Sequence, residues 1–384
     1  MNPEKTDYFL NLYNNILDKY NIEVRKLQVK QEEYNKREQD ILTIKENTNQ
    51  ILKLLQEQQR KEEKKVGIAN IEIKKQEEPI IETKIQSLKK VTEIEHKSDV
   101  WSITELSDLR IATGDDKGYI TLFTIDYEKE RWTKLNEELG HDNGVNSLCE
   151  LSRNKLVSSG SFDYSIKVWD ISNDTFRLIK TLDEHSDNVC QVIPFTKDII
   201  VSGSQDQTIK IWNVNAEQED IKTLKEDFPV CSILKLRNKD EMVAGGRGET
   251  VSFWNTITFE KVRTVECCDC ENLIELHNHY VAVSGASSPA IDIIDPENYR
   301  AIKRIEYRGY IGSGGLLHLL NNGTFIYSNE GCFCQISSTT FDILFKEQIE
   351  DEFSGTVITS SLNGKYIIAD NDNSGVSIFR VDYI

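Results

Sequence analysis

The pattern of apolar and polar positions changes once along the chain, near residue 83. Before that point, apolar or aromatic residues recur at alternating intervals of three and four: Leu10, Tyr13, Leu17, Tyr20, Val24, Leu27 and Tyr34. Gln, Glu, Lys and Asn occupy most of the other positions, and no Gly or Pro occurs between Pro3 and Gly67. Such a stripe is typical of a coiled-coil helix, whose apolar seam faces a partner helix.

The stripe is interrupted at Gln31 and Glu38 and then resumes in another phase up to Leu55. Residues 1–66 are therefore predicted to form a coiled-coil helix, because a lone helix of this length cannot bury its apolar side. The alternative is a single helix that packs on its own globular domain. Residues 67–82 are predicted to be a linker, since Gly67 ends the helix and Pro79 prevents its return.

From about residue 83 the period of the pattern becomes two, as in β-strands. Two stretches, GSFDYSIKVWD (residues 160–170) and GSQDQTIKIWN (residues 203–213), are nearly the same. The position of their Trp recurs seven times at intervals of 40 to 46 residues, as Phe123, Trp169, Trp212, Trp254, Ile294, Ile336 and Phe379. A period of this length predicts seven copies of one structural unit.

These repeats resemble the WD-repeat (G-beta-like) family, whose members form β-propellers with one four-stranded blade per repeat. The resemblance covers about residues 83–384. It rests on GHDNGV and EHSDNV before the first strand, on SSGSFD and SGSQD after the second, and on WD and WN at the end of the third. It implies an all-β fold, a seven-bladed β-propeller, with the predicted coiled-coil segment in front of it.

In this family a His, a Ser or Thr, an Asp and a Trp form a hydrogen-bonded network inside a blade. The matching residues are His141, Ser159, Asp163 and Trp169 in one repeat, and His185, Ser202, Asp206 and Trp212 in the next. Because a buried carboxylate needs donors, we expect these residues to be structural and not catalytic. The fourth repeat keeps Trp254 but lacks the His and has Gly248 in place of the Asp. The fifth to seventh repeats retain only the apolar period and the turns, so we expect apolar packing, and not this network, to hold their blades.

The last repeat has no match for the outer strand of the other repeats before Ile384, whereas residues 87–95 (SLKKVTEIE) match it at the front. Pairing of these two parts would close the ring and cover an open sheet edge. We therefore predict residues 87–95 as the ring-closing strand. Trp101, Asn146, Cys190 and Cys231 occupy equivalent positions in the first strands and are expected to line the inner wall.

Charge and composition narrow the possible partners. The chain has a net charge of −18, made up of +2 for residues 1–75 and −20 for the remainder. This charge disfavours nucleic acid and membrane surfaces and favours basic partners. With no signal peptide, no long apolar run and irregularly spaced cysteines, we expect a cytoplasmic protein with reduced thiols, and leave nuclear and cytoskeletal locations open.

Motifs of catalysis are missing from the sequence. No phosphate-binding loop, H-E-x-x-H or G-x-S-x-G occurs, so we expect neither an enzyme nor a cofactor. Cysteines and histidines that could suggest zinc are Cys267, Cys268, Cys270, Cys332, Cys334, His277 and His279. Their spacing does not suit a zinc site and they fall in different repeats, so we expect buried thiols and no metal.

The resemblance also implies a binding surface, formed by the loops before the first strand and between the second and third strands. On this chain those loops contain Asp99, Phe162, Asn188, Gln205, Pro229, Arg247 and Asp269. We interpret the chain as a non-enzymatic protein–protein interaction scaffold, with an acidic propeller that binds protein segments and a coiled coil for oligomerisation or docking. The alternatives are a substrate-recognition subunit of a ubiquitin ligase, or a structural subunit of a large assembly such as the cytoskeleton.

Overall fold

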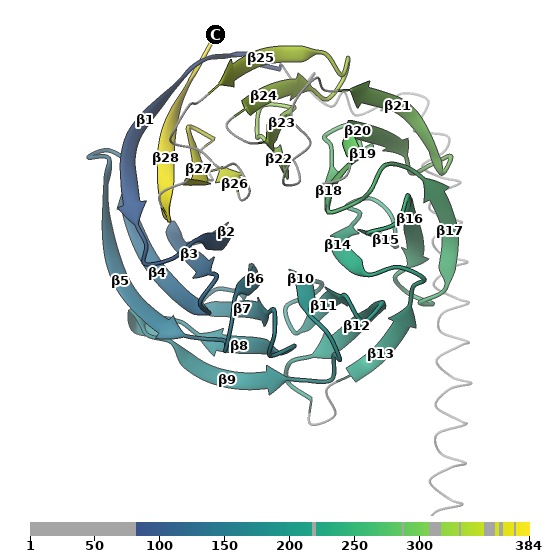
Figure 1. The fold of residues 1–384 in the computed structure, drawn as a ribbon, viewed down its shortest axis with the longest axis horizontal. Helices are drawn as coiled ribbons and strands as arrows, with labels where there is room; N and C mark the ends of the chain where they lie inside the picture. Colours follow the sequence, from purple (N-terminus) through teal and green to yellow (C-terminus); the bar gives the residue numbers. More distant parts are fainter. Residues whose placement is uncertain are drawn as a thin grey trace, which may run out of the picture. The chain divides into compact units, whose positions relative to one another are not determined.

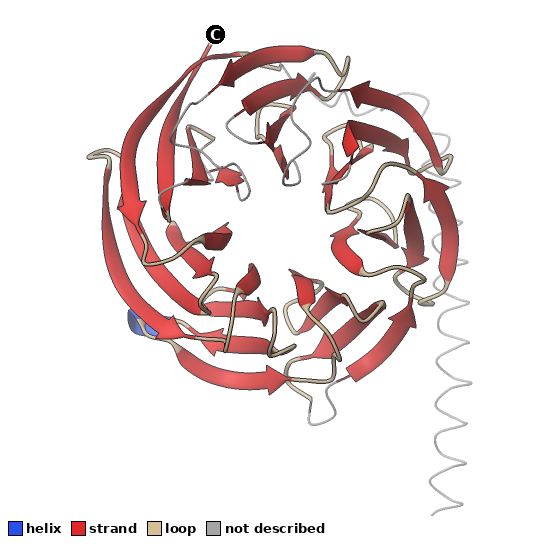
Figure 2. Ribbon diagram, viewed as in Figure 1, coloured by secondary structure: helices blue, strands red, loops and turns tan. Residues whose placement is uncertain are grey.

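The computed structural model describes residues 82–384, apart from residues 217–219, 286–287, 307–315, 330–331, 349–357, 361–363 and 372–373. The predicted coiled coil, residues 1–66, and residues 67–81 of the predicted linker lie outside the described residues. Within the described part, seven four-stranded antiparallel sheets follow one another around a ring (Figure 1). Strands dominate, and one short 3-10 turn, η1 (Ser172–Asp174), is present among these residues (Figure 2).

Each sheet is one blade, and its strands are listed from the centre of the ring outward. Blade 1 consists of β2 (Val100–Glu105), β3 (Arg110–Asp115), β4 (Tyr119–Asp126) and β5 (Arg131–Leu139). Blade 2 consists of β6 (Val145–Ser152), β7 (Lys155–Gly160), β8 (Ile166–Asp170) and β9 (Arg177–Leu182). Blade 3 consists of β10 (Val189–Pro194), β11 (Ile199–Ser204), β12 (Thr208–Asn213) and β13 (Asp220–Lys225).

The remaining blades follow the same order. Blade 4 consists of β14 (Val230–Lys235), β15 (Glu241–Gly246), β16 (Thr250–Asn255) and β17 (Lys261–Glu266). Blade 5 consists of β18 (Asn272–Glu275), β19 (Val281–Gly285), β20 (Ser288–Asp295) and β21 (Arg300–Glu306). Blade 6 consists of β22 (Leu316–Leu319), β23 (Thr324–Asn329), β24 (Cys332–Ser337) and β25 (Ile343–Gln348). Blade 7 consists of β26 (Ile358–Ser360), β27 (Tyr366–Asn371), β28 (Gly375–Tyr383) and β1 (Ile85–Glu95).

Blade 7 combines the two ends of the described part of the chain. Its outer strand β1, which contains residues 87–95, pairs antiparallel with β28 from Ile85–Tyr383 to Glu95–Gly375 (Figure 1). The Ile85 N–H also donates to Gln335 Oε1 in blade 6 (2.7 Å), so the start of β1 is attached to two blades. This pairing covers the edge that β28 would otherwise expose to other chains.

The core lies between the blades. Successive side chains of a strand point to opposite faces of its sheet, so a blade with apolar residues on both faces can pack on two neighbours. Seven apolar clusters fill the seven interfaces between blades, including the one between blades 7 and 1. Trp212 and Phe253 are among the largest fully buried side chains, and replacing either with Ala costs about 3–5 kcal/mol.

Candidate functional site

The His–Ser–Asp–Trp residues of blade 3 form one connected network. His185 Nδ1 lies 2.7 Å from Asp206 Oδ2, and His185 Nε2 lies 2.7 Å from Ser202 Oγ. The Trp212 indole N–H donates to the same Ser202 oxygen at 2.8 Å. The donors therefore run from Trp through Ser to His and end on the carboxylate, which requires the His tautomer with its proton on Nδ1.

Blade 2 contains the same network with one change from the expected residues. His141 Nε2 lies 2.7 Å from Ser158 Oγ, and Trp169 Nε1 donates to this oxygen at 2.8 Å. The prediction of Ser159 was wrong: its hydroxyl has no hydrogen-bond partner among the described residues. The segment between the serine and Asp163 is one residue longer than in blade 3, so an alignment on the Trp shifts the serine by one. Adjacent strand residues face opposite sides, so this shift turns Ser159 away from His141.

A His between a carboxylate and a serine hydroxyl has the connectivity of a hydrolase triad. In blades 2 and 3, however, Ser158 and Ser202 are completely buried, and each hydroxyl oxygen already accepts an indole N–H. A substrate carbonyl could not reach either oxygen without unfolding of the blade. The geometry therefore indicates a stabilising network and offers no nucleophile.

The carboxylates of the two networks are held in their charged form. Burial by itself raises the pKa of Asp163, but the hydrogen bond and charge of His141 and the Ser165 hydrogen bonds lower it from 3.8 to about 2. The pKa of Asp206 is also lowered, because His185 and Thr208 outweigh the effect of burial. A carboxylate that accepts several hydrogen bonds binds a proton only in more acidic solution.

Blade 4 has a buried polar network that the sequence analysis did not predict. Glu226, whose side chain is 0% exposed, accepts hydrogen bonds from Trp254 Nε1 (2.6 Å), Ser252 Oγ (3.0 Å) and Lys261 Nζ (2.6 Å). A single carboxylate thus replaces both the His and the Asp of blades 2 and 3. Trp254 was the residue in the sequence that could have indicated this network. A buried indole N–H needs a hydrogen-bond acceptor, and the fourth repeat has no His or Asp at the usual positions to provide the network.

Blades 5 and 6 have the predicted apolar packing, and in addition each contains a polar network that the repeat pattern did not indicate. In blade 5, the buried Asp292 accepts two hydrogen bonds from Arg304 (2.7 and 2.6 Å) and one from the Cys268 N–H (2.6 Å). In blade 6, Gln335 donates to Thr324 Oγ1 (2.9 Å) and to the Thr83 carbonyl (2.8 Å). These partners come from loops and neighbouring strands that the repeat alignment leaves out.

The seven residues predicted for the binding surface lie at one edge of the ring. Asp99, Asn188, Pro229 and Asp269 precede the inner strands β2, β10, β14 and β18, and Phe162, Gln205 and Arg247 lie between the second and third strands of blades 2, 3 and 4. Because the strands of each blade alternate in direction, these two sets of loops share one end of the blade. We call this edge the loop face.

The structure brings some of these residues together and separates others. Asn188 and Gln205 contact one another through two hydrogen bonds, of 2.9 and 3.3 Å. Arg247 reaches the next blade, where its Nε lies 3.5 Å from Glu271 Oε1. Asp99, which precedes the inner strand of blade 1, accepts a hydrogen bond from Ser374 in blade 7 (2.6 Å). This acid therefore lies where blades 7 and 1 meet, and not beside Asp269 in blade 5.

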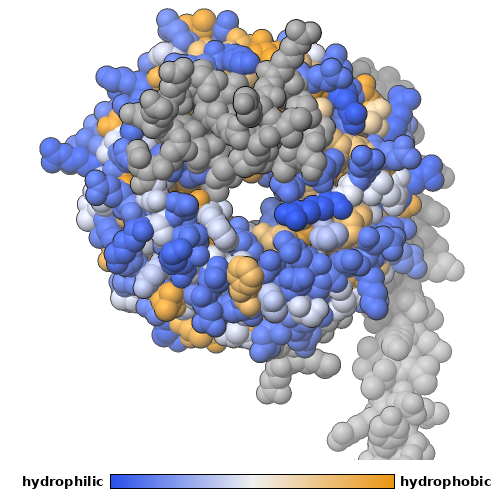
Figure 3. Space-filling model, in the orientation of Figure 1, coloured by the Kyte–Doolittle hydropathy of each residue, from blue (hydrophilic) through white to orange (hydrophobic). Residues whose placement is uncertain are grey.

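Two aromatic side chains are among the exposed large apolar residues of the described part of the chain. Phe162 is 62% exposed and Trp101 is 41% exposed. Figure 3 shows one face of the molecule, on which isolated apolar residues are surrounded by hydrophilic ones. A surface of this kind suits recognition by charge and a few anchoring side chains better than by a broad apolar patch.

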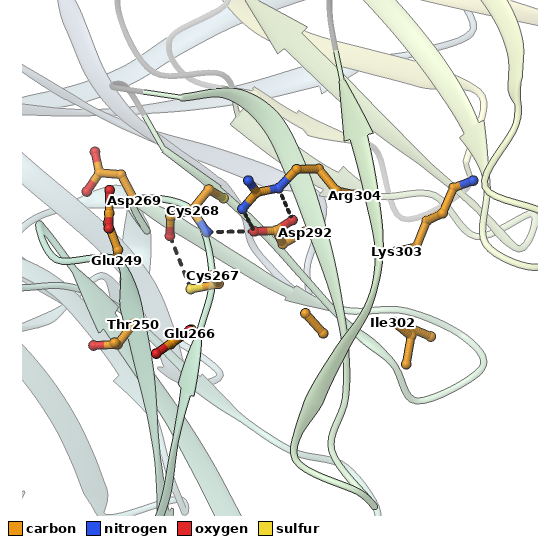
Figure 4. Close-up of a pocket in the computed structure, with 11 residues that line it drawn as sticks. Glu249, Thr250, Glu266, Cys267, Cys268, Asp269, Asp292, Ile302, Lys303 and Arg304 are labelled. Atoms are coloured by element: carbon orange, nitrogen blue, oxygen red, sulfur yellow. Dashed lines mark hydrogen bonds and ion pairs between the residues drawn. The ribbon is translucent and has the colours of Figure 1, made fainter.

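A cavity of about 770 Å³ lies between blades 4 and 5, next to Asp269 (Figure 4). Its lining residues come from the loop between β15 and β16, the start of β16, the end of β17, the loop before β18, and strands β20 and β21. They are Glu249, Thr250, Glu266, Cys267, Cys268, Asp269, Asp292, Ala301, Ile302, Lys303 and Arg304. We call it the acidic pocket, because four of these residues are acids and two are bases.

The acids of the pocket lie in two places. Asp292 is bound by Arg304, and Figure 4 shows this pair together with the Cys268 N–H. Glu249, Glu266 and Asp269 lie toward one side of the view, with Ile302 and Lys303 at the other. A positively charged side chain that enters the pocket would meet these carboxylates and the aliphatic part of the opposite wall.

The cysteines near the pocket are buried thiols. Cys267, Cys268 and Cys270 belong to the apolar cluster between blades 4 and 5. Burial raises the pKa of Cys268 to about 12 and raises the pKa of Cys270 as well. Among the described residues no group of three or more His, Cys, Asp and Glu side chains is placed to hold a metal ion.

Comparison with known proteins agrees with this geometry. Residues 132–170 and 176–213 each match the family model described as WD domain, G-beta repeat. These two segments are WD repeats. They run from β5 to β8 and from β9 to β12, and so they contain both His–Ser–Asp–Trp networks. The predicted WD repeats and seven-bladed propeller are confirmed.

Among solved structures, the WD40 β-propeller domain of Doa1 is similar to this propeller, with 18% sequence identity and a TM-score of 0.64. The similarity covers 77% of this chain and 97% of that chain, and it concerns the fold. No curated protein matches the sequence. In the part of the chain that the structure describes, no helix is long and apolar enough to cross a membrane.

Proposed function

We propose that this WD-repeat propeller is a protein-interaction scaffold that captures basic protein segments at its loop face, with the acidic pocket as an anchoring point. WD-repeat propellers are in general non-enzymatic domains that bind other proteins. The observation that supports the proposal most is the acidic pocket itself, a cavity of about 770 Å³ with Glu249, Glu266 and Asp269 on its lining.

Charge supports the same choice of partner. Residues 76–384 have a net charge of −20, so the field around the propeller attracts Lys- and Arg-rich segments before contact. Attraction of this kind raises the association rate and weakens as salt screens it, with a screening length of about 8 Å at physiological ionic strength. Acidic and neutral segments would lack this advantage.

The test measures association of the full chain with basic, acidic and neutral peptides over a range of ionic strength. Asp269→Asn combined with Glu249→Gln should slow association of the basic peptide several-fold at low salt and flatten its salt dependence. Glu260→Gln is the matched control, because Glu260 is an exposed acid between β16 and β17, at the opposite end of blade 4. Equal binding of the three peptides, or a salt dependence unchanged by the double substitution, contradicts the proposal.

For residues 1–66 we propose a helical element that joins copies of the chain or docks it to an assembly. The apolar stripe that includes Leu17 and Val24 supports this role. Glu at both positions would place charge in the seam, which costs several kcal/mol. Sedimentation of the full chain should then show a smaller assembly, or a partner pulled down with the native chain should be lost; if neither changes, the segment has another role.

A further inference from the structure

The acidic pocket has a basic wall opposite its acids. Lys303 and Arg304 are neighbours in β21, the outer strand of blade 5, and both line the pocket. Figure 4 shows Lys303 on the side of the view opposite Glu249 and Asp269. Both basic residues are exposed. A partner segment that enters the pocket therefore meets positive as well as negative charge.

Arg304 is held in one orientation by a buried acid. Its Nε and Nη2 atoms donate to Asp292 Oδ1 and Oδ2 at 2.7 and 2.6 Å, and the Cys268 N–H also donates to Asp292 Oδ2 at 2.6 Å. The Asp292 side chain is 3% exposed, whereas the Arg304 side chain is 53% exposed. The pair thus turns its positive part toward solvent. Asp292 does not bind the third nitrogen of Arg304, Nη1, and a guanidinium fixed in this way suits recognition of a carboxylate.

Lys303 is the second positive group of this wall. In the part of the chain that the structure describes, no hydrogen bond or ion pair joins its ammonium group to an acid. The pairing of β21 with β20 skips Ile302, so a β-bulge lies directly beside Lys303. Ile302 is 37% exposed and adds an aliphatic surface to the same wall. This wall can therefore bind a carboxylate together with the apolar part of its side chain.

The size of the pocket limits the segment that it can hold. Its volume of about 770 Å³ corresponds to a sphere roughly 11 Å across, which is within the usual range of ligand pockets. In an extended chain, side chains two residues apart point to the same side and are roughly 7 Å from one another. Two such side chains fit into the pocket together, whereas a wider spacing places one of them outside.

We propose that the acidic pocket selects extended protein segments in which a basic and an acidic residue stand two positions apart. The basic side chain lies against Glu249 and Glu266. The acidic side chain accepts hydrogen bonds from Lys303 and from Arg304 Nη1. This inference rests on the proposed function, and it narrows the partner from basic segments in general to those with such a pair.

The two walls discriminate by repulsion as well as by attraction. A segment with basic residues at both positions places a like charge against Lys303 and Arg304, and a segment with acids at both positions places one against Glu249 and Glu266. Juxtaposed like charges weaken binding, and such repulsion is a common basis of specificity. The net charge of the propeller attracts many basic segments, and the charges inside the pocket decide which of them stay bound.

The experiment measures equilibrium binding of the full chain to two basic peptides of the same composition and net charge. In the first peptide a Lys and the single Glu stand two positions apart, and in the second peptide the Glu is moved at least seven positions away from any Lys. Physiological ionic strength screens the long-range attraction equally for both peptides. The first peptide should bind about fivefold more tightly, which is the effect of one good ion pair.

Charge reversal at Lys303 tests which wall reads the acid. In Lys303→Glu the first peptide should lose its advantage, and a peptide with Lys in place of its Glu should bind more tightly than to the native chain. Lys222→Glu is the matched control, because Lys222 is an exposed lysine at the equivalent position of the outer strand of blade 3. This control changes the net charge by the same amount and should keep the preference of the native chain.

The outcomes separate this inference from the proposed function. If the two peptides bind equally well, or if Lys303→Glu and Lys222→Glu change the preference alike, this inference is wrong. The proposed function then still stands, provided that binding depends on Glu249 and Asp269. If neither peptide binds, both the proposed function and this inference are wrong.

Discussion

Replacement of Glu226 by Ala distinguishes the two accounts of blade 4. If apolar packing alone held this blade, the loss of a polar side chain there would have little effect. In the structure, Glu226 is the shared acceptor of Trp254, Ser252 and Lys261. Its removal leaves one buried indole N–H and one buried hydroxyl without their acceptor.

The magnitude follows from the three donors. A buried donor without a partner costs about 1–3 kcal/mol, and this applies in full to the Trp254 indole. The buried Ser252 hydroxyl adds a smaller cost, and Lys261, which is 31% exposed, can return to water. We therefore expect Glu226→Ala to lower the free energy of unfolding by about 3 kcal/mol. This value is at the lower end of the cost of removing one partner of a buried ion pair, which is about 3–5 kcal/mol. Glu226→Gln should lose less, because its carbonyl oxygen can still accept one hydrogen bond.

The assay is urea unfolding of the full chain, followed by tryptophan fluorescence. The slope of the unfolding free energy against urea concentration must be the same for the variant and the native chain, so that a change of midpoint reports a change of stability. Glu260→Ala is the control, since this exposed acid of the same blade should change stability by no more than about 0.5 kcal/mol. Faster amide hydrogen exchange in β16 and β17, with blade 2 unchanged, would locate the effect. A loss below about 1 kcal/mol for Glu226→Ala would refute the network and return blade 4 to apolar packing.

Two further predictions concern blade 2. Ser158→Ala should cost about 2–3 kcal/mol, because it removes the partner of both Trp169 Nε1 and His141 Nε2, whereas Ser159→Ala should change stability by less than about 0.5 kcal/mol; similar urea midpoints for the two variants would contradict the register. Since the pKa of Asp163 falls from 3.8 in the unfolded chain to about 2 in the fold, its stabilising effect is complete above about pH 5 and is lost as the pH falls toward 2. The urea midpoint of Asp163→Asn should therefore fall less steeply than that of the native chain between pH 5 and 2, and parallel curves would count against this assignment.

Sequence alone was sufficient for the repeated parts of this protein. The two-residue period, the spacing of Trp169 and Trp212 and the loop positions of Asp99, Asn188 and Asp269 depend on local patterns, which every blade must satisfy by itself. The same holds for blade 3, whose His185, Ser202, Asp206 and Trp212 lie at the usual distances along the chain. Where the turn of blade 2 gained one residue, the same rule misplaced the serine by one position.

Only the tertiary structure decided which groups from different elements meet. Glu226 follows β13 but completes the network of blade 4, and Gln335 in blade 6 binds the chain at Thr83, more than 250 positions away. These contacts arise because closing the ring brings the faces of separate blades together, and a one-dimensional pattern contains the period of the blades but not the pairing across their interfaces.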